Sequence, residues 1–314
     1  MDRTVVMGGG ALGMLLAGKL AAAGIPVRMW TRTREQALVV GERGIELEEG
    51  AERVKRVVRL EAAAFEEAAP AETDLVLVAI KQTAASDRTL RELDLKTGAG
   101  SAIVLFQNGI GHAERFAEAL PGRRILVAVT TEGALRTGVA SVRHTGSGTT
   151  WIGEWGDGSD EEAVARSAAE PRRAADLLEK AGFSAFVSNS IRERMLRKLL
   201  INAVINPLTA LWRVPNGELP ATPDRMAVME ALFRETLGIL RKHGLKDGGE
   251  RELWASVLEV CRATAANRSS MLQDVLAGRD TEIGALNGAL CELAASVGMK
   301  APWNAAVAAL VKAI

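Results

Sequence analysis

The stretch Thr4-Val5-Val6-Met7-Gly8-Gly9-Gly10-Ala11-Leu12-Gly13 decides how the first half of this 314-residue chain folds. A short β-branched run ends in glycines, and leucines at helical spacing follow until about Gly24. A second run with strand character occupies residues 26–31. Strand, glycine turn, helix and strand in this order predict the first βαβ unit of an α/β fold with a Rossmann-type, doubly wound sheet.

Each glycine of the G-x-G-x-x-G pattern has a mechanical role. Gly8 allows a tight turn, Gly10 lets backbone amides approach a pyrophosphate, and Gly13 lets the helix pack close to the sheet. The N-terminus of the helix adds partial positive charge for the phosphates. Because a strand and a helix flank the pattern, it predicts a dinucleotide site made by these residues: Gly8, Gly9, Gly10, Ala11, Leu12 and Gly13.

The end of the second strand indicates which dinucleotide binds. An NAD site usually presents a carboxylate there, which holds the 2′-hydroxyl of the ribose. This chain has Trp30-Thr31-Arg32-Thr33-Arg34 instead. A guanidinium pairs with a 2′-phosphate, whereas a carboxylate repels it. Arg32 as first candidate, and Arg34 as second, therefore predict NADPH as the cofactor. The alternative is that both arginines are solvated loop residues.

Polar side chains follow three further strands. Apolar runs predict strands buried on both faces of a parallel sheet at 74–80, 102–106 and 125–129. Lys81, Asn108 and Thr131 come directly or almost directly after these runs. Ligands of open α/β sheets lie beyond the carboxyl ends of the strands, so the three positions together favour a shared site. Each of them alone could be a turn residue.

The remaining pattern divides the chain into two domains. Residues 44–60 predict a small appended hairpin, 142–155 two short strands, and 156–171 an exposed loop or fraying helix. From Ser190 onward the pattern is helical almost throughout, with breaks expected at these places: Pro207, Pro215, Pro220–Pro223, Gly244–Gly249, Gly278 and Pro302. We therefore expect a Rossmann-type NADP-binding domain over 1–189 and an all-helical C-terminal domain over 190–314.

Composition excludes several classes of protein. Lys plus Arg and Asp plus Glu each number 39, so nothing indicates nucleic acid or an anionic membrane as a partner. The two cysteines, Cys261 and Cys291, lie in apolar helical patterns and fit buried free thiols in a reducing compartment. No basic-apolar leader and no membrane-spanning run occurs, which favours a cytoplasmic protein. No metal-ligand spacing is present, so we expect no metal.

The first helix of the second half carries an unusual row of polar side chains. Lys198, Asn202 and Asn206 stand at i, i+4 and i+8 on one face of a helix that is otherwise apolar. An amide buried without a partner costs about 1–3 kcal/mol, and an ammonium costs more. Either Lys198 reaches solvent and the asparagines bond to neighbouring carbonyls, or the row lines a wet pocket in which Lys198 donates a proton.

Two further polar positions have local alternatives. Ser270 with Gln273 fits a capping box at a helix start, and Glu282 fits the acidic first turn of the next helix. The three histidines, at positions 112, 144 and 243, have no carboxylate or cysteine at a spacing that would indicate a catalytic or metal-binding partner. We interpret them as loop or surface residues. Without a catalytic histidine, Lys198 is the preferred proton donor.

Several motifs resemble the 2-dehydropantoate 2-reductase (ketopantoate reductase) family, in the right order over the whole chain. They are the glycine loop, Gln107-Asn108-Gly109, the run from Lys198 through Asn206-Pro207-Leu208-Thr209-Ala210, Pro215-Asn216-Gly217-Glu218-Leu219, and 269–274 with Thr281-Glu282-Ile283. The resemblance implies NADPH-dependent reduction of 2-dehydropantoate to D-pantoate, a step toward pantothenate and coenzyme A. The segment 156–171 looks like an insertion away from these motifs.

The resemblance also implies residue roles. Lys198 would be the catalytic lysine, and Glu282 would act close to it and to the nicotinamide ribose. Substrate groups would be held by Asn202, Asn206, Asn216 and Ser270, and Asn108 would contact both cofactor and substrate. Arg32 would read the 2′-phosphate, Lys81 would be a basic residue near the cofactor, and Ala134 would touch the cofactor through its backbone.

A lysine is suited to this reaction for physical reasons. Hydride addition to a ketone builds negative charge on oxygen, which a nearby cation stabilises. Burial would lower the pKa of Lys198 and Glu282 would raise it again. Two rival functions remain: reduction of another branched 2-oxo acid, and a non-catalytic NADPH-binding sensor. The apolar helical faces of the second half also leave a homodimer open.

Overall fold

The computed structural model describes residues 3–70, 73, 75–156 and 169–314. It divides into two compact units. The first consists of Met1–Gln107 and His112–Ile191, and the second of Asn108–Gly111 and Arg192–Ile314. The short piece Asn108–Gly111 thus belongs with the second unit, although the chain on both sides of it belongs with the first. Part of the segment 156–171 lies outside the described residues.

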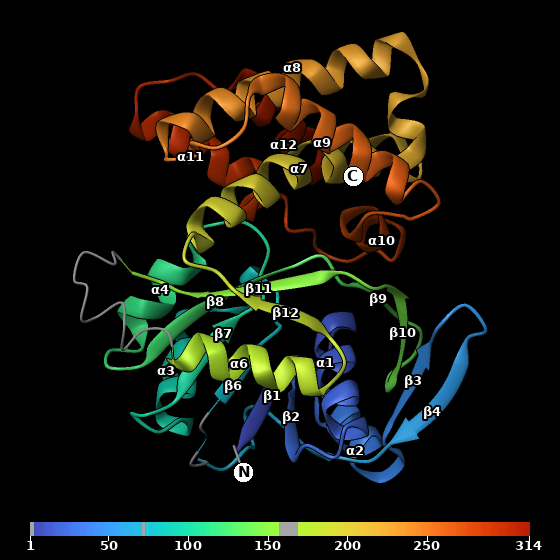
Figure 1. Ribbon diagram of the computed structural model, residues 1–314, viewed down its shortest axis with the longest axis vertical. Coiled ribbons are helices and arrows are strands. Elements are labelled where there is room, and N and C mark those ends of the chain that lie inside the picture. The colour runs from blue at the N-terminus through green and yellow to red at the C-terminus, as the bar shows by residue number, and fades with distance from the viewer. Residues whose placement is uncertain (1–2, 71–72, 74, 157–168) are drawn as a thin grey trace. The chain divides into compact units, whose positions relative to one another are not determined.

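An eight-stranded sheet forms the centre of the first unit (Figure 1). Its strands are β1 (Thr4–Met7), β2 (Val27–Thr31), β5 (Glu61–Ala64), β6 (Leu75–Val78), β7 (Ala102–Leu105), β8 (Arg124–Thr130), β11 (Thr149–Glu154) and β12 (Ser184–Val187). The spatial order is β12-β11-β8-β7-β6-β1-β2-β5, and every pair is parallel except β11 with β8. The six parallel strands follow the order of a Rossmann sheet, with its switch point between β1 and β6.

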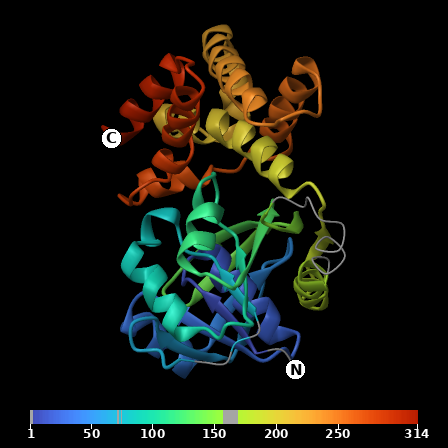
Figure 2. The ribbon, with the colours of Figure 1, turned by 90° about the vertical axis from the view of Figure 1, so that its left-hand side faces the viewer.

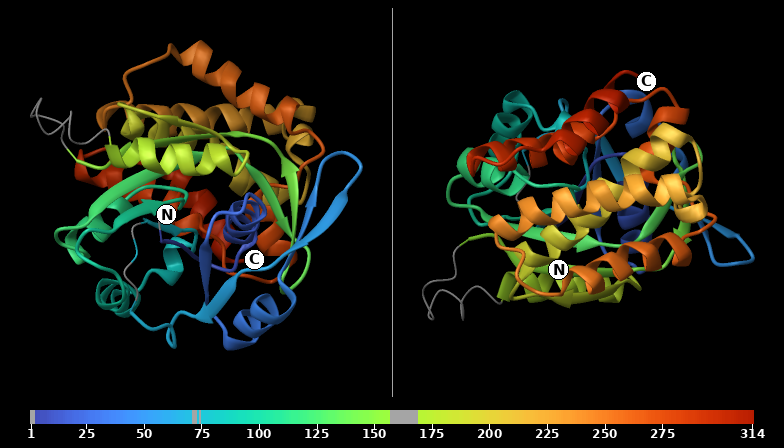
Figure 3. Two further views of the ribbon diagram at one scale, coloured as in Figure 1. Left: turned by 60° about the horizontal axis from the view of Figure 1, so that its bottom comes forward. Right: turned by 90° about the horizontal axis from the view of Figure 1, so that it is seen from above.

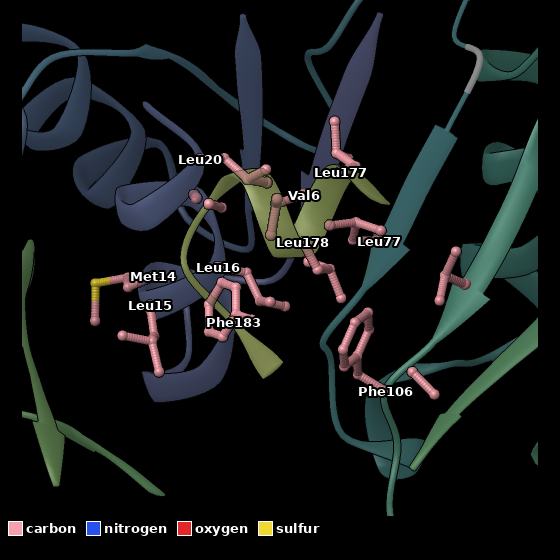
Figure 4. Packing of buried hydrophobic residues seen from close by; sticks show 14 of the residues in the cluster. Val6, Met14, Leu15, Leu16, Leu20, Leu77, Phe106, Leu177, Leu178 and Phe183 are labelled. Carbon is pink, nitrogen blue, oxygen red and sulfur yellow. The ribbon is translucent and has the colours of Figure 1, made fainter. Parts of the chain in front are cut away.

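Helices cover the sheet and explain its apolar strands. They are α1 (Ala11–Ala22), α2 (Arg34–Arg43), α3 (Asp87–Lys96), α4 (His112–Ala119) and α6 (Ala169–Lys180), with a 3₁₀ turn η1 (Gln82–Ala84). All residues of β1, β6 and β7 are buried, as strands enclosed on both faces require. Figure 4 shows Val6, Leu77 and Phe106 packing with Leu178 and Phe183 in the core.

A smaller sheet packs on α1. Its strands are β3 (Ile45–Glu49), β4 (Val54–Val58), β9 (Gly133–Arg136) and β10 (Ser141–Gly146), in the order β4-β3-β10-β9. The hairpin expected over 44–60 is confirmed as β3–β4, drawn in blue in Figure 3. The two strands expected over 142–155 exist but lie in different sheets, because β10 pairs with β3 and β9 while β11 pairs with β8 and β12.

The second unit is helical, as expected (Figures 1 and 2). It contains α7 (Ile191–Trp212), α8 (Pro223–Lys242), α9 (Glu250–Ala263), α10 (Ser270–Leu276), α11 (Asn287–Ser296) and α12 (Pro302–Lys312), with 3₁₀ turns η2 (Asn216–Ala221) and η3 (Ile283–Ala285). Pro223 and Pro302 each begin a helix, where the missing N–H costs nothing. Within the described ranges, no helix has the length and apolarity needed to cross a membrane.

The break expected at Pro207 is wrong, because α7 runs through it to Trp212. A proline inside a helix leaves the carbonyl four residues earlier without its usual donor, and here that carbonyl belongs to Ala203. The fully buried side chain of Asn287 donates to this carbonyl over 3.0 Å. The same amide nitrogen also donates to Asn304 Oδ1. A side chain from α11 therefore replaces the hydrogen bond that the proline removes.

Candidate functional site

The glycine loop in the first unit has the shape that a dinucleotide needs. Gly8 has a φ of +128°, which a residue with a side chain rarely adopts. A Cβ on Gly13 would lie 1.9 Å from the carbonyl oxygen of Gly8, so this position needs glycine for α1 to reach the loop. A Cβ on Gly10 would meet no atom within 4 Å. Gly10 also caps α1 without any side-chain hydrogen bond. The loop thus leaves an open cradle at a helix N-terminus, which fits a pyrophosphate.

The arginines after β2 differ in their surroundings. Arg34 is exposed and lies 3.8 Å from Glu67, an exposed ion pair. Arg32 is also exposed, and within the described part of the chain it forms no ion pair. Thr33 between them caps α2 by accepting a hydrogen bond from the backbone of Gln36. The side chain of Arg32 is therefore available for a 2′-phosphate, which agrees with the first choice made from the sequence.

The ends of β6 and β7 carry a lysine and an amide. Lys81, partly buried, precedes η1. Gln107 lies two residues after the end of β7, next to Phe106, and is 7% exposed. Neither its Nε2 nor its Oε1 makes a hydrogen bond within the described structure. An unpaired buried amide is unfavourable, so its presence at the carboxyl edge fits a polar ligand. In the sequence, Gln107 stands out only as part of the motif Gln107-Asn108-Gly109.

Thr131, directly after β8, is tied up in contacts with a neighbouring strand, unlike the buried amide of Gln107 near the end of β7. Its hydroxyl accepts a hydrogen bond from the backbone N–H of Thr149 at 2.8 Å and lies 3.3 Å from the carbonyl oxygen of the same residue. These contacts tie the end of β8 to β11, so Thr131 has a structural role. Ala134 lies in β9 of the small sheet, where it pairs with His144.

The interpretation of the histidines as loop or surface residues is wrong for two of them. His112 is 3% exposed at the start of α4, where Nδ1 lies 3.1 Å from Gln82 Nε2. His144 lies in β10, and its Nε2 is 2.6 Å from Glu132 Oε2. The sequence could not show this pair, because the pairing of β9 with β10 brings the two residues together. His243 ends α8 and lies 2.9 Å from the carbonyl oxygen of Leu293.

The polar row of the second unit lies on α7, as expected; Figure 1 labels this helix. Lys198 and Asn202 are partly buried, and Asn206 is buried. Burial lowers the pKa of Lys198 from 10.5 to about 8, although the negative charge of Glu282 opposes the shift. Glu282 precedes the 3₁₀ turn η3, where the sequence predicted a helix start. Both directions of the pKa effect agree with the expectation from the sequence.

Asn108 contacts Glu282 within the same unit. Its Nδ2 donates to Glu282 Oε2 over 3.3 Å, which connects residues 174 positions apart. This contact agrees with the placement of the short piece Asn108–Gly111 in the second unit, where Ile110 also packs against the core. The structure therefore brings together three of the expected site residues: an amide, a carboxylate and a lysine whose pKa responds to that carboxylate.

The capping box expected at Ser270 is wrong. Ser269 caps α10, because its Oγ accepts from the N–H of Leu272 at 3.0 Å. Ser269 also lies 2.7 Å from the Thr209 hydroxyl on α7, and Gln273 donates to the carbonyl of Arg268. Ser270 is exposed in the first turn of the helix. The local explanation for Ser270 is thereby removed, and its hydroxyl is available for a ligand.

Asn216 is held at the start of η2. Its backbone N–H donates to the carbonyl of Asn267, and its Nδ2 donates to Thr264 Oγ1 at 2.8 Å. Its Oδ1 is buried and makes no hydrogen bond within the described residues. A Cβ on the next residue, Gly217, would lie 2.6 Å from Ala265, so this glycine allows the close approach that fixes Asn216.

The described residues contain no group of three or more His, Cys, Asp or Glu side chains that could hold a metal ion. The chemistry available is that of a lysine, carboxylates, hydroxyls and amides in the second unit, and of a phosphate cradle in the first.

Comparison with known proteins gives a consistent result. A family model described as "Ketopantoate reductase PanE/ApbA" matches residues 4–157, and its companion, "Ketopantoate reductase PanE/ApbA C terminal", matches residues 190–314. The chain is 32% identical to the 2-dehydropantoate 2-reductase of Halobacterium salinarum, over 99% of this chain and 98% of that protein. It is 33% identical to the enzyme of that name from Bacillus subtilis, over 94% and 92%.

Solved structures agree on the fold. A Bacillus subtilis crystal structure titled as a probable 2-dehydropantoate 2-reductase superposes with a TM-score of 0.81 at 32% identity, covering 99% of each chain. A D-mandelate dehydrogenase in complex with NADH and anilino(oxo)acetate gives a TM-score of 0.89 at 22% identity, covering 99% of this chain and 98% of the other. At that identity the second likeness supports the fold alone.

Proposed function

The chain belongs to the ketopantoate reductase family, and we propose that it reduces the ketone of 2-dehydropantoate to the alcohol of D-pantoate with NADPH. The observation that carries this proposal is the position of Lys198, on a polar helix row and under the influence of Glu282. A non-catalytic sensor has no need of such a proton donor.

The residues of the first unit are suited to hold NADPH, which would supply the hydride when bound. The cradle at Gly10 would receive the pyrophosphate, and Arg32 would pair with the 2′-phosphate. Lys81 and the buried amide of Gln107, at the ends of β6 and β7, are suited to the nicotinamide half. That half belongs on this side of the switch point, because β1 separates β6 and β7 from β2.

The residues of the second unit are suited to hold the oxo acid. Its carboxylate can accept hydrogen bonds from the Ser270 hydroxyl and from asparagine amides of the α7 row. Asn216 offers an acceptor, Oδ1, that suits a substrate hydroxyl. As negative charge builds on the ketone oxygen, the Lys198 ammonium stabilises it and transfers a proton to it. Glu282 keeps the lysine protonated, and Asn108 orients Glu282.

A pKa near 8 suits this task. At pH 7 the amine is mostly protonated, and it gives up its proton more readily than an ordinary lysine. After the transfer the neutral amine can take a proton from solvent. Lys198 thus acts as a general acid when the ketone is reduced and as a general base when the alcohol is oxidised in the reverse reaction.

Cofactor preference is expected to depend on Arg32. Arg32→Ala should raise the Kd of NADPH by roughly 10- to 100-fold, because a charge-assisted bidentate pair is lost, and should change the Kd of NADH little. Arg34→Ala, which removes the neighbouring exposed arginine already paired with Glu67, is the matched control. Titration of each variant with both cofactors measures the effect. Equal weakening of NADPH and NADH in Arg32→Ala would mean that other residues read the 2′-phosphate.

The activity itself is tested by NADPH oxidation. We expect purified protein to oxidise NADPH rapidly with 2-dehydropantoate and slowly with 2-oxoisovalerate, which lacks the hydroxymethyl group. Preference for another branched 2-oxo acid would support the rival reductase. Tight NADPH binding without oxidation of any 2-oxo acid would support the sensor.

Two finer properties stay predictions. The free Cys261 and Cys291 fit a reducing compartment, so we propose a cytoplasmic location. We also propose a homodimer. The mass obtained from sedimentation of the protein at micromolar concentration in the analytical ultracentrifuge would test it.

A further inference from the structure

Gln36 connects the glycine loop to two other elements of the first unit. It lies in the first turn of α2 and is 5% exposed. Its amide nitrogen donates to the carbonyl oxygen of Gly9 at 2.8 Å and to that of Val139 at 2.8 Å. The primary amide has two N–H groups, and both are satisfied. A buried side chain with both donors satisfied in this way has one defined position.

The Gly9 carbonyl that Gln36 holds belongs to the peptide between Gly9 and Gly10. Arg136 Nη1 also donates to this oxygen, at 3.4 Å. The carbonyl and the N–H of a trans peptide point in opposite directions. Fixing the Gly9 carbonyl toward α2 and the small sheet therefore fixes the Gly10 N–H toward the opposite side, at the start of α1.

Packing explains why residue 9 is glycine. The fingerprint G-x-G-x-x-G leaves this position open to any residue. Here a Cβ on Gly9 would lie 2.0 Å from Gln36 Oε1, 2.5 Å from its Cδ and 2.6 Å from its Nε2. No part of this amide can move aside without breaking its bonds to Gly9 and Val139. The middle glycine of the run, Gly9, is therefore required by the Gln36 side chain.

We propose that Gln36 is a positioning residue for the cofactor. It holds the Gly9–Gly10 peptide so that the Gly10 N–H donates to the pyrophosphate, and through Val139 it makes the turn between β9 and β10 part of this support. The inference rests on the proposed NADPH binding. It assigns a function to the small sheet, which packs on α1.

The test compares a cofactor that has a pyrophosphate with a fragment that lacks one. In Gln36→Ala we expect the Kd of NADPH to rise about 10-fold, because the peptide is no longer held in the binding orientation. The Kd of 2′-AMP, which carries the adenosine and 2′-phosphate alone, should stay within about twofold of the wild-type value. Gln36→Glu keeps the size but loses both donors, so it should weaken NADPH at least as much. Leu38→Ala, at an exposed position of α2, is the matched control.

A double variant tests the packing argument independently. Gly9→Ala alone should lower both the melting temperature and the affinity for NADPH, because its Cβ collides with the amide of Gln36. In Gly9→Ala/Gln36→Ala the collision is gone, so NADPH affinity should equal that of Gln36→Ala alone. Additive losses in the double variant would contradict the proposed contact.

The outcomes separate this inference from the proposed function. If wild-type protein does not bind NADPH, the proposed function fails. If it does and Gln36→Ala binds NADPH equally well, only the role of Gln36 is overturned. Equal weakening of NADPH and 2′-AMP would show that Gln36 merely stabilises the loop that carries Arg32, and this also overturns the inference.

Discussion

Lys198→Met should lower kcat for 2-dehydropantoate reduction by ~10²-fold or more and leave the Kd of NADPH within about twofold of the wild-type value. Methionine keeps the apolar stem on α7 and removes the proton donor. General acid catalysis contributes about 10²–10⁴-fold, which sets the size of the loss. Stopped-flow or steady-state NADPH oxidation measures kcat, and fluorescence titration measures Kd. Wild-type kcat in this variant would exclude Lys198 as the acid.

The pH profile gives the same residue a second signature. Reduction needs the ammonium form, and the pKa is about 8, so kcat/KM should fall as the pH rises through 8 and should be flat below it. Oxidation of D-pantoate needs the neutral amine and should rise over the same interval. Glu282 raises this pKa, so Glu282→Gln should shift the descending limb to lower pH. A limb that stays in place in Glu282→Gln would mean that another group titrates there.

Gly10→Ala should leave the fold intact and weaken NADPH by roughly 10- to 100-fold, since an added methyl group in a fitted contact typically costs 1–3 kcal/mol. A Cβ on Gly10 meets no atom of the described protein, so the melting temperature should not fall. Calorimetric titration and thermal unfolding measure the two effects.

Two other glycines serve as comparisons for this variant. Gly13→Ala places its Cβ against the Gly8 carbonyl and should lower the melting temperature as well as the affinity. Gly41→Ala, also unobstructed but inside α2, should leave the affinity unchanged and should not lower the melting temperature, because alanine favours a helix more than glycine does. If Gly10→Ala binds NADPH as the wild type does, the pyrophosphate does not lie at this cradle.

Local patterns were sufficient to predict most of the fold. The glycine loop, the continuous apolar runs and the helical second half each have a physical cause within a few residues of sequence. Errors arose where a distant residue decides the outcome. Pro207 looked like a helix end because the donor that allows it, Asn287, comes from another helix. Ser270 fits the capping-box pattern because Gln273 stands three residues later, but Ser269 is the cap, and its contact with Thr209 on α7 could not be seen in the sequence.

The residues of the candidate site also fall into those that a local pattern predicts and those that depend on distant contacts. The row beginning at Lys198 is visible because helical periodicity alone aligns it. Gln36 was not found, since Thr33-Arg34-Glu35-Gln36 reads as an ordinary capping box and its contacts with Gly9 and Val139 exist only after the sheets form. Gln107 gave a weak signal, as a polar residue close to the end of a buried strand.

The bond between Asn287 and Ala203 also has a consequence for synthesis. The two residues are 84 positions apart, so a ribosome completes α7 long before it makes the side chain that satisfies the Ala203 carbonyl. Domains tend to fold from the N-terminus as the chain emerges, and the first unit can follow that order for most of its length. For the second unit, the side chain that satisfies the Ala203 carbonyl is made only in the last tenth of the chain, so a chain that stops before Asn287 leaves this carbonyl of α7 without that donor.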